Sequence, residues 1–191
     1  EERQVTMDGQ TYTMELPFMV IATQNPIEYE GTYRLPEAQL DRFLFKINVP
    51  YPSEEQEFKI LTRFHELGNA QVLANIFAVL TAQQIKEVRQ LVKNIIIEEK
   101  LLQFIAKLIV TTRNHKSIFL GASPRASLAV MNAAKAVAGM SGRDFVIPDD
   151  IVYVTPYVLR HRILLTPEKE MEGITTDDVI QQVIHSLEIP R

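Results

Sequence analysis

The sequence predicts the end of an α/β domain followed by an all-helical bundle, so that the chain is mainly α overall. Residues 17–22 form an apolar run without alternation, which is typical of a strand buried on both faces of a parallel sheet. From Ser53 onward, apolar residues recur at helical spacing behind repeated helix-capping signals. The boundary is expected near Tyr51-Pro52, which assigns residues 1–51 to the α/β part and residues 52–191 to the helical part.

The first 50 residues are predicted to form short strands and loops. Asp8-Gly9 lies between β-prone runs and predicts a hairpin. Pro36 fits the first position of a short helix expected over Glu37–Phe43. Apolar and polar residues alternate over 45–49, which predicts a further strand. Since so few strands cannot form a stable sheet alone, further strands are expected upstream of Glu1.

Six helices are predicted in the second part of the chain. Each expected start combines a capping residue, a proline at the first turn or the onset of an apolar face. These starts lie near Ser53, Thr81, Leu101, Pro124, Pro148 and Thr175.

Composition excludes several classes of protein and site. The 191 residues contain no cysteine, so disulfides and cysteine-based metal sites are excluded. The four histidines are scattered and never paired at helical spacing, so no metal site is expected. A net charge of -4 disfavours a nucleic-acid partner. Without a signal peptide or an apolar run near 18 residues, no membrane insertion is expected, and the predicted location is cytoplasmic.

One candidate site residue, Asn25, follows the apolar run at 17–22. Ligands of open α/β sheets bind beyond the carboxyl ends of strands, where an Asn side chain could orient water or contact a phosphate. Asn25-Pro26 is also a common turn-forming pair, and on the local sequence alone that structural role is favoured.

Two arginines are further candidates. Arg42 lies at the end of the short predicted helix, where its planar, always-charged guanidinium could reach phosphate oxygens in a neighbouring subunit. The alternative is a surface arrangement of Asp41 and Arg42 with little energetic effect, and on the local sequence alone that alternative is favoured. Arg125 lies in the first turn of a helix, where a cation is disfavoured unless an anion is near, so a phosphate site and a solvent-facing side chain are equally compatible.

These stretches together resemble the MoxR family of AAA+ ATPases, and the resemblance covers essentially the whole chain. It rests on the following segments: Pro17–Glu28, Glu30–Tyr33, Leu35–Phe43, Leu120–Ala126, Gly142–Val146, Leu159–Ile163 and Ile189–Arg191. It implies the second half of such a protein, namely the end of a P-loop NTPase core of AAA+ type followed by the helical lid.

The resemblance implies three functional positions. Asn25 would be sensor 1 and would help to place the attacking water. Arg42 would be the arginine finger, which acts in trans on a neighbour's nucleotide. Arg125 would be sensor 2, which contacts nucleotide phosphates, in cis or in trans. The Asp8-Gly9 hairpin matches one that often faces the central pore of related ATPases, although an ordinary connection between strands is equally compatible.

The sequence lacks the parts of an ATPase that hold ATP and Mg²⁺. No G-x-x-x-x-G-K-[ST] loop and no apolar strand ending in paired acids is present. The intact protein is therefore expected to use ATP and Mg²⁺, whereas this chain alone is expected neither to bind ATP usefully nor to hydrolyse it.

The resemblance also implies a ring oligomer, expected to be a hexamer, with a chaperone-like role toward partner proteins, including partners with von Willebrand-type domains. The alternative from another class is a helical protein-interaction module without a nucleotide role. A nucleic-acid-binding helical domain is least favoured because of the negative charge.

Overall fold

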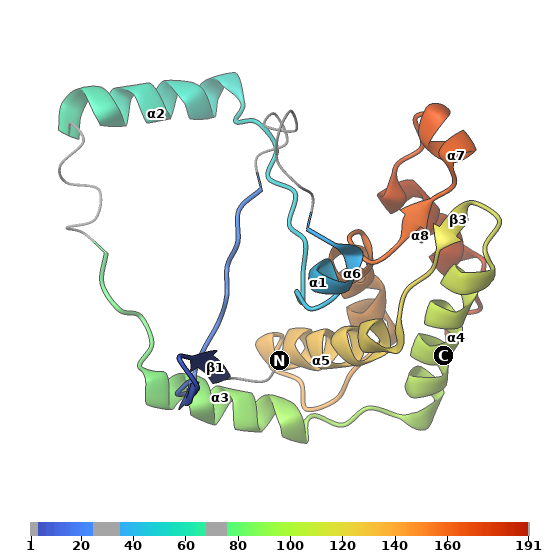
Figure 1. Ribbon diagram of the computed structural model, residues 1–191, viewed down its shortest axis with the longest axis horizontal. Helices are drawn as coiled ribbons and strands as arrows, with labels where there is room; N and C mark the ends of the chain where they lie inside the picture. The colour runs from blue at the N-terminus through green and yellow to red at the C-terminus, as the bar shows by residue number, and fades with distance from the viewer. Residues whose placement is uncertain (1–3, 25–34, 68–75, 191) are drawn as a thin grey trace.

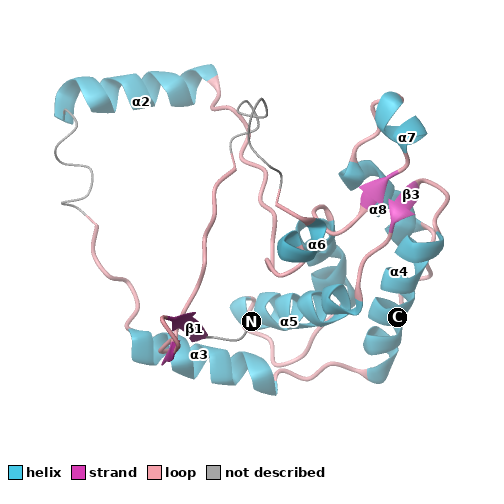
Figure 2. Cartoon of the chain, in the orientation of Figure 1, coloured by secondary structure: helices cyan, strands magenta, loops and turns pink. Residues whose placement is uncertain are grey.

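The computed structural model describes residues 4–24, 35–67 and 76–190 (Figure 1). The described chain is mainly helical, and its strands form two small two-stranded sheets (Figure 2). The helices are α1 (Glu37–Leu40), α2 (Glu54–Leu67), α3 (Ala82–Asn94), α4 (Glu99–Asn114), α5 (Pro124–Met140), α6 (Pro148–Leu159), α7 (Pro167–Met171) and α8 (Thr176–His185). The strands are β1 (Gln4–Met7), β2 (Gln10–Thr13), β3 (Ile118–Leu120) and β4 (Leu164–Leu165).

The hydrophobic core lies in the bundle of α4, α5, α6 and α8. Helix α5 packs against α3, α4 and α6, while α8 packs against α4 and α6. The buried face of α5 is mostly alanine, which lets the neighbouring helices approach closely. The largest buried side chains around it include Leu108, Ile109, Ile151, Leu159 and Ile180. The six predicted helices are confirmed as α2, α3, α4, α5, α6 and α8.

The bundle carries three further elements that the sequence pattern did not predict: the strands β3 and β4 and the helix α7. Strand β3 pairs antiparallel with β4, and Ile118 lies opposite Leu165 in this pair. The five-residue helix α7 follows β4 directly and begins with Pro167 at its first turn. Both strands and α7 are short, so they give little periodic signal in the sequence.

The predicted N-terminal hairpin is confirmed. Strands β1 and β2 pair antiparallel, with Gln4 opposite Thr13 and Met7 opposite Gln10. Asp8 and Gly9 connect them with φ angles of 52° and 77°. A two-residue turn of this kind needs positive φ at both positions, a conformation that Gly adopts readily and Asp tolerates.

The two other strands predicted in the first 50 residues are wrong for the described chain. Residues 17–22 and 45–49 form neither helix nor strand and lie outside both sheets. The side chains of Met19 and Ile21 are 79% and 83% exposed. Apolar strands of this type become buried only between neighbouring strands and covering helices, which the described residues do not supply. The short helix is also shorter than predicted, since α1 ends at Leu40 and residues 41–44 form turns and bends.

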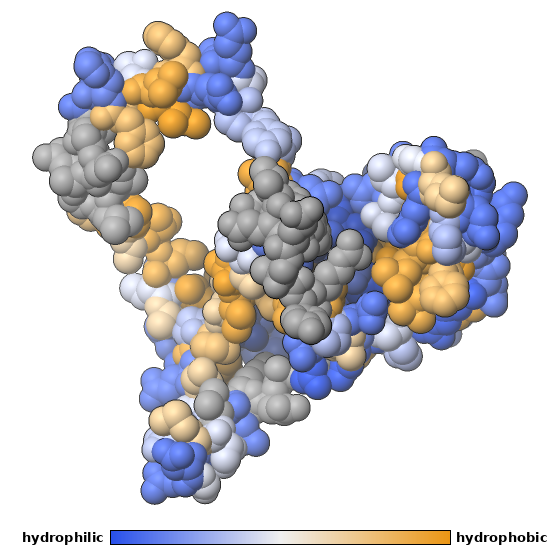
Figure 3. Space-filling model, turned by 45° about the horizontal axis from the view of Figure 1, so that its top comes forward, coloured by the Kyte–Doolittle hydropathy of each residue, from blue (hydrophilic) through white to orange (hydrophobic). Residues whose placement is uncertain are grey.

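Helix α2 lies apart from the bundle (Figure 1). Its apolar side chains, Phe58, Ile60, Leu61 and Phe64, are exposed, and Figure 3 shows apolar surface gathered on this arm. Within the described ranges, no helix combines the length and the apolar character needed to cross a membrane.

Candidate functional site

The loop before α5 is fixed against α4 by close packing and by hydrogen bonds. Gly121 approaches α4 so closely that a Cβ atom there would lie 2.6 Å from the Cα of Arg113. The buried residue Ala122 is held at both ends. Its N–H donates to the Thr112 hydroxyl at 3.1 Å, and its carbonyl accepts from Arg113 Nε at 2.8 Å. The start of α5 therefore has a defined position on the bundle.

Helix α5 begins as its sequence predicts. The hydroxyl of Ser123 accepts a hydrogen bond from the backbone N–H of Arg125, and Pro124 occupies the first turn. The side chain of Arg125 is 47% exposed and lies beside the carboxylate of Asp41, with 3.7 Å between Nη1 and Oδ2. A cation in the first turn of a helix requires a nearby anion, and in this structure that anion is the carboxylate of Asp41.

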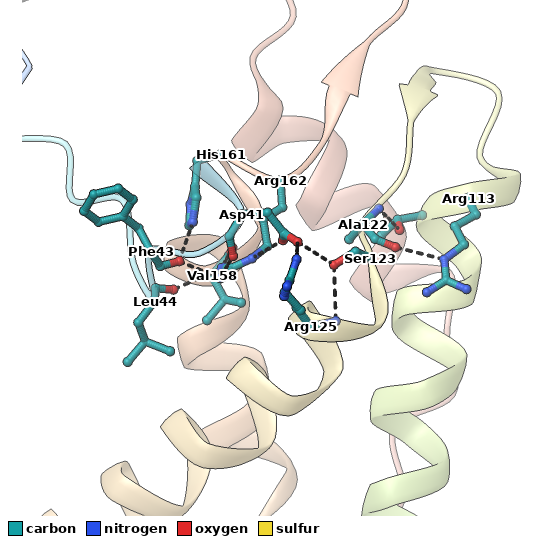
Figure 4. A network of polar contacts seen from close by, with 11 residues as sticks. Asp41, Phe43, Leu44, Arg113, Ala122, Ser123, Arg125, Val158, His161 and Arg162 are labelled. Atoms are coloured by element: carbon teal, nitrogen blue, oxygen red, sulfur yellow. Dashed lines mark hydrogen bonds and ion pairs between the residues drawn. The ribbon is translucent and has the colours of Figure 1, made fainter. Parts of the chain in front are cut away.

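The segment that follows α1 is bound to the carboxyl end of α6 by Arg162 (Figure 4). The Arg162 side chain is only 3% exposed, and its Nε donates to Asp41 Oδ1 at 3.0 Å. Its two terminal nitrogens donate to the carbonyls of Asp41, Phe43, Leu44 and Val158. Burial lowers the pKa of Arg162, although the hydrogen bond and the charge of Asp41 act in the opposite direction.

Two neighbours of Arg162 hold the same segment. Arg160 donates to the carbonyl of Lys46 at 3.3 Å and forms an ion pair with Asp177 at 3.0 Å. His161 Nε2 lies 2.9 Å from the carbonyl of Phe43. Burial lowers the pKa of His161 to about 4, and the charges of Arg162 and Lys46 act in the same direction. His161 is therefore neutral at pH 7, and since a carbonyl only accepts, Nε2 carries the proton.

The Asp41 carboxylate is where these parts of the chain meet. Besides Arg162 and Arg125, it accepts a hydrogen bond from the Ser123 hydroxyl at 2.8 Å. One acidic side chain thus joins the residue after α1, the start of α5 and the end of α6. A small pocket of about 190 Å³ lies at this junction and is lined by side chains that include Glu37, Asp41, Ser123, His161 and Arg162.

The structure places two of the three predicted site residues near this junction. Arg125 contacts Asp41 directly, and Arg42 is the residue next to Asp41, with an exposed side chain. Asn25 lies outside the described residues, so its predicted approach to Arg125 stays a prediction. The alternative of a surface arrangement of Asp41 and Arg42 is wrong for Asp41, which is largely buried and has three partners from the helical part.

Comparison with known proteins gives the family. The model for the ATPase family associated with various cellular activities (AAA) matches residues 1–45, and the AAA lid domain model matches residues 110–183. Over 100% of its own length, this chain is 42% identical to the uncharacterized protein YeaC of Bacillus subtilis. It is 40% identical to the chaperone MoxR1 of Mycobacterium tuberculosis, again over 100% of this chain. The chain belongs to the MoxR family of AAA+ ATPases.

The structural comparison agrees with the sequence relatives. The MoxR-family chain matches the crystal structure of a "putative ATPase" from Cytophaga hutchinsonii with a TM-score of 0.89 and 37% identity. That match covers 100% of this chain and 59% of the other. The chain likewise spans 58% of the length of YeaC and 52% of the length of MoxR1. Its fold is therefore that of an AAA+ core end followed by a helical lid.

Several residues that organise this MoxR-family site were missed by reasoning from single motifs. Asp41 and the run Arg160–Arg162 together fix the segment that carries Arg42. Their signals were the Leu35–Phe43 and Leu159–Ile163 stretches, which counted toward the resemblance but suggested no role for Asp41 or for Arg160–Arg162. In the described ranges, no group of three or more histidines or acids could hold a metal ion.

Proposed function

We propose that this chain supplies the nucleotide-sensing and trans-acting residues of a MoxR-type AAA+ ATPase. Residues 1–51 belong to the ATPase core and residues 52–191 to the lid. The complete protein forms a ring, taken to be a hexamer, in the cytoplasm. It couples ATP hydrolysis to chaperone-like remodelling of partner proteins, among them partners with von Willebrand-type domains.

The contact of Asp41 with Arg125 and Ser123 carries this proposal. It joins the segment of the proposed arginine finger, Arg42, to the helix start that bears the proposed sensor 2 residue. The two motifs are 83 residues apart in the sequence and belong to different proposed domains. A helical interaction module without a nucleotide role does not predict this contact between the segment that carries Arg42 and the helix start that carries Arg125.

The chemistry of the two arginines fits their proposed roles. Arg125 is half-exposed in the first turn of the 17-residue helix α5, where the helix dipole adds to its attraction for a phosphate. Arg42 has an exposed side chain, as an arginine that stabilises charge on a neighbour's nucleotide requires. Asn25 would act as sensor 1. Mg²⁺ and the phosphates would be held mainly by the upstream half that the resemblance implies.

Mixed rings of the complete ATPase test this proposal. Arg42→Ala is expected to lower ATP turnover by roughly three powers of ten, because the charge at the neighbouring nucleotide is no longer compensated. A second variant that lacks the lysine of its phosphate-binding loop is inactive but keeps Arg42. Co-assembly of the two variants is expected to restore part of the turnover, because intact sites then receive an arginine from a neighbour.

Arg89→Ala in the exposed part of α3 is the matched control and should leave turnover unchanged. If co-assembled rings hydrolyse ATP no faster than the two variants measured separately, Arg42 does not act in trans. Full turnover by the Arg42→Ala protein would show that it does not act at all.

A further inference from the structure

We infer that Asp41 is a positioning residue that couples the nucleotide contact of Arg125 to the placement of Arg42. This inference rests on the proposed function. Asp41 precedes Arg42 in the chain, and its carboxylate is shared by one arginine that is buried and one that is half-exposed. The difference between these two partners determines what Asp41 does.

Arg162 is the permanent partner. It is almost fully buried and donates to Asp41 Oδ1 and to four backbone carbonyls, including those on either side of Arg42. Moving the backbone away from Arg162 would break these hydrogen bonds and leave buried guanidinium N–H groups without acceptors, which is costly. The backbone around Arg42 therefore stays bound to the end of α6.

Arg125 is the exchangeable partner. Its Nη1 lies 3.7 Å from Asp41 Oδ2, and the arginine is half-exposed. Ion pairs of this kind contribute little to stability because water screens them. A nucleotide phosphate carries more negative charge than a carboxylate and can accept two parallel hydrogen bonds from a guanidinium. Phosphate and Asp41 therefore compete for Arg125.

The Ser123 hydroxyl makes this competition matter for Arg42. It donates to Asp41 Oδ2, the same oxygen that faces Arg125, and it also caps α5. When a phosphate takes Arg125, the Asp41 oxygen loses one of its two partners on α5. Of the two contacts that Asp41 makes with the start of α5, only the hydrogen bond from Ser123 is then kept. A nucleotide bound in one subunit thus alters the position of Arg42, the residue that acts on the nucleotide of the neighbouring subunit.

Asp41→Asn in the complete ATPase tests the inference, because asparagine keeps the shape of the side chain and removes its charge. The dissociation constant of the Mg²⁺ complex of a non-hydrolysable ATP analogue is measured by calorimetry. We expect this constant to fall about two- to fivefold, since Arg125 loses its competing anion. The turnover number should fall about tenfold, because Arg42 loses its link to α5.

A double-variant cycle separates coupling from a merely structural role. In an Arg125→Gln background, Asp41→Asn should leave the dissociation constant unchanged, because the group for which it competes is absent. Asp149→Asn, an exposed residue in the first turn of α6, is the matched control and should leave both quantities unchanged. Thermal unfolding of each variant checks that the proteins remain folded.

Weaker or unaltered binding in Asp41→Asn would overturn the inference, as would equal tightening in the Arg125→Gln background. The proposed function fails separately if Arg42→Ala and Arg125→Gln both leave ATP turnover unchanged. If those two variants are inactive while Asp41→Asn behaves like Asp149→Asn, only the coupling is overturned.

Discussion

Gly121 shows how one residue fixes the approach of a whole loop. A Cβ atom at this position would meet the backbone of Arg113, which cannot move without displacing α4. Gly121→Ala is expected to lower the free energy of unfolding by about 2 kcal/mol, as overpacked sites do. Urea unfolding of the chain measures the change.

Gly139→Ala is the matched control for this prediction. Its Cβ would meet the end of the Ile95 side chain at 2.9 Å, which can rotate, and would lie at ordinary contact distance, 3.8 Å, from a Val92 methyl group. Alanine also favours the helix more than glycine does, so the change should cost little or stabilise. Equal destabilisation by the two variants would contradict the packing explanation of Gly121.

His161 should make stability depend on pH between about 4 and 6.5. Its pKa in the folded chain is about 4, against an ordinary value of 6.5, because burial disfavours the charged ring. The unfolded chain therefore binds more protons in this window, and stability falls as pH is lowered from 6.5 toward 4. His161→Gln, which can still donate to the Phe43 carbonyl, should lose this part of the pH dependence.

Thermal unfolding from pH 4 to 7 compares the two chains. His185→Gln, on the exposed end of α8, is the control and should keep the pH dependence of the original chain. If His161→Gln shows the same slope as the original chain in this window, the buried ring is not the titrating group.

At the scale of elements, the docking of residues 41–46 on α6 depends on the planar donors of Arg162. The ammonium group of lysine has three N–H donors at a single nitrogen, so it cannot donate to the five acceptors that Arg162 contacts. Arg162→Lys should therefore loosen this segment. The backbone N–H of Lys46, which donates to the Tyr157 carbonyl at 3.0 Å, should exchange with solvent about tenfold faster.

Hydrogen exchange of single amides measures this effect, with Arg63→Lys on the exposed helix α2 as control. Unchanged exchange at Lys46 in Arg162→Lys would show that the segment is held by contacts other than the guanidinium.

Helices and strands differed in how well the sequence predicted them. The starts of α3, α5 and α8 are set by caps within a few residues, such as the Thr81–Gln84 and Thr175–Asp178 boxes, so local sequence sufficed. Residues 17–22 carry the composition of a central strand, but a parallel strand forms only beside other strands. The apolar pattern of residues 17–22 thus fits a position between neighbouring strands, and the described chain contains no such strands beside them.

For the molecule as a whole, we expect the 191-residue chain to show no ATP turnover above background. The sequence contains neither a phosphate-binding loop nor the strand acids that hold Mg²⁺, so Arg125 and Arg42 would have no positioned nucleotide to act on. A coupled assay of phosphate release measures this. Turnover that Arg125→Ala abolishes would contradict the prediction.

The candidate site was predictable only in part at this scale. Arg42 and Arg125 stood out because their motifs are contiguous in the sequence. Their meeting at Asp41 was not predictable, because it depends on the folded bundle placing Ser123 and Arg162 beside a residue more than 80 positions earlier. Long-range polar contacts leave no periodic signal in a single sequence.

The distance along the chain between Asp41 and Arg162 has a consequence for synthesis. These residues are 121 positions apart, and the contact of His161 with Phe43 spans 118. At ribosomal rates, about 6 to 24 s pass between the emergence of Asp41 and that of Arg162. During this interval the segment that carries Arg42 has no site on which to dock. The nascent chain therefore exposes its proposed arginine finger well before the end of α6, on which the segment docks, has been made.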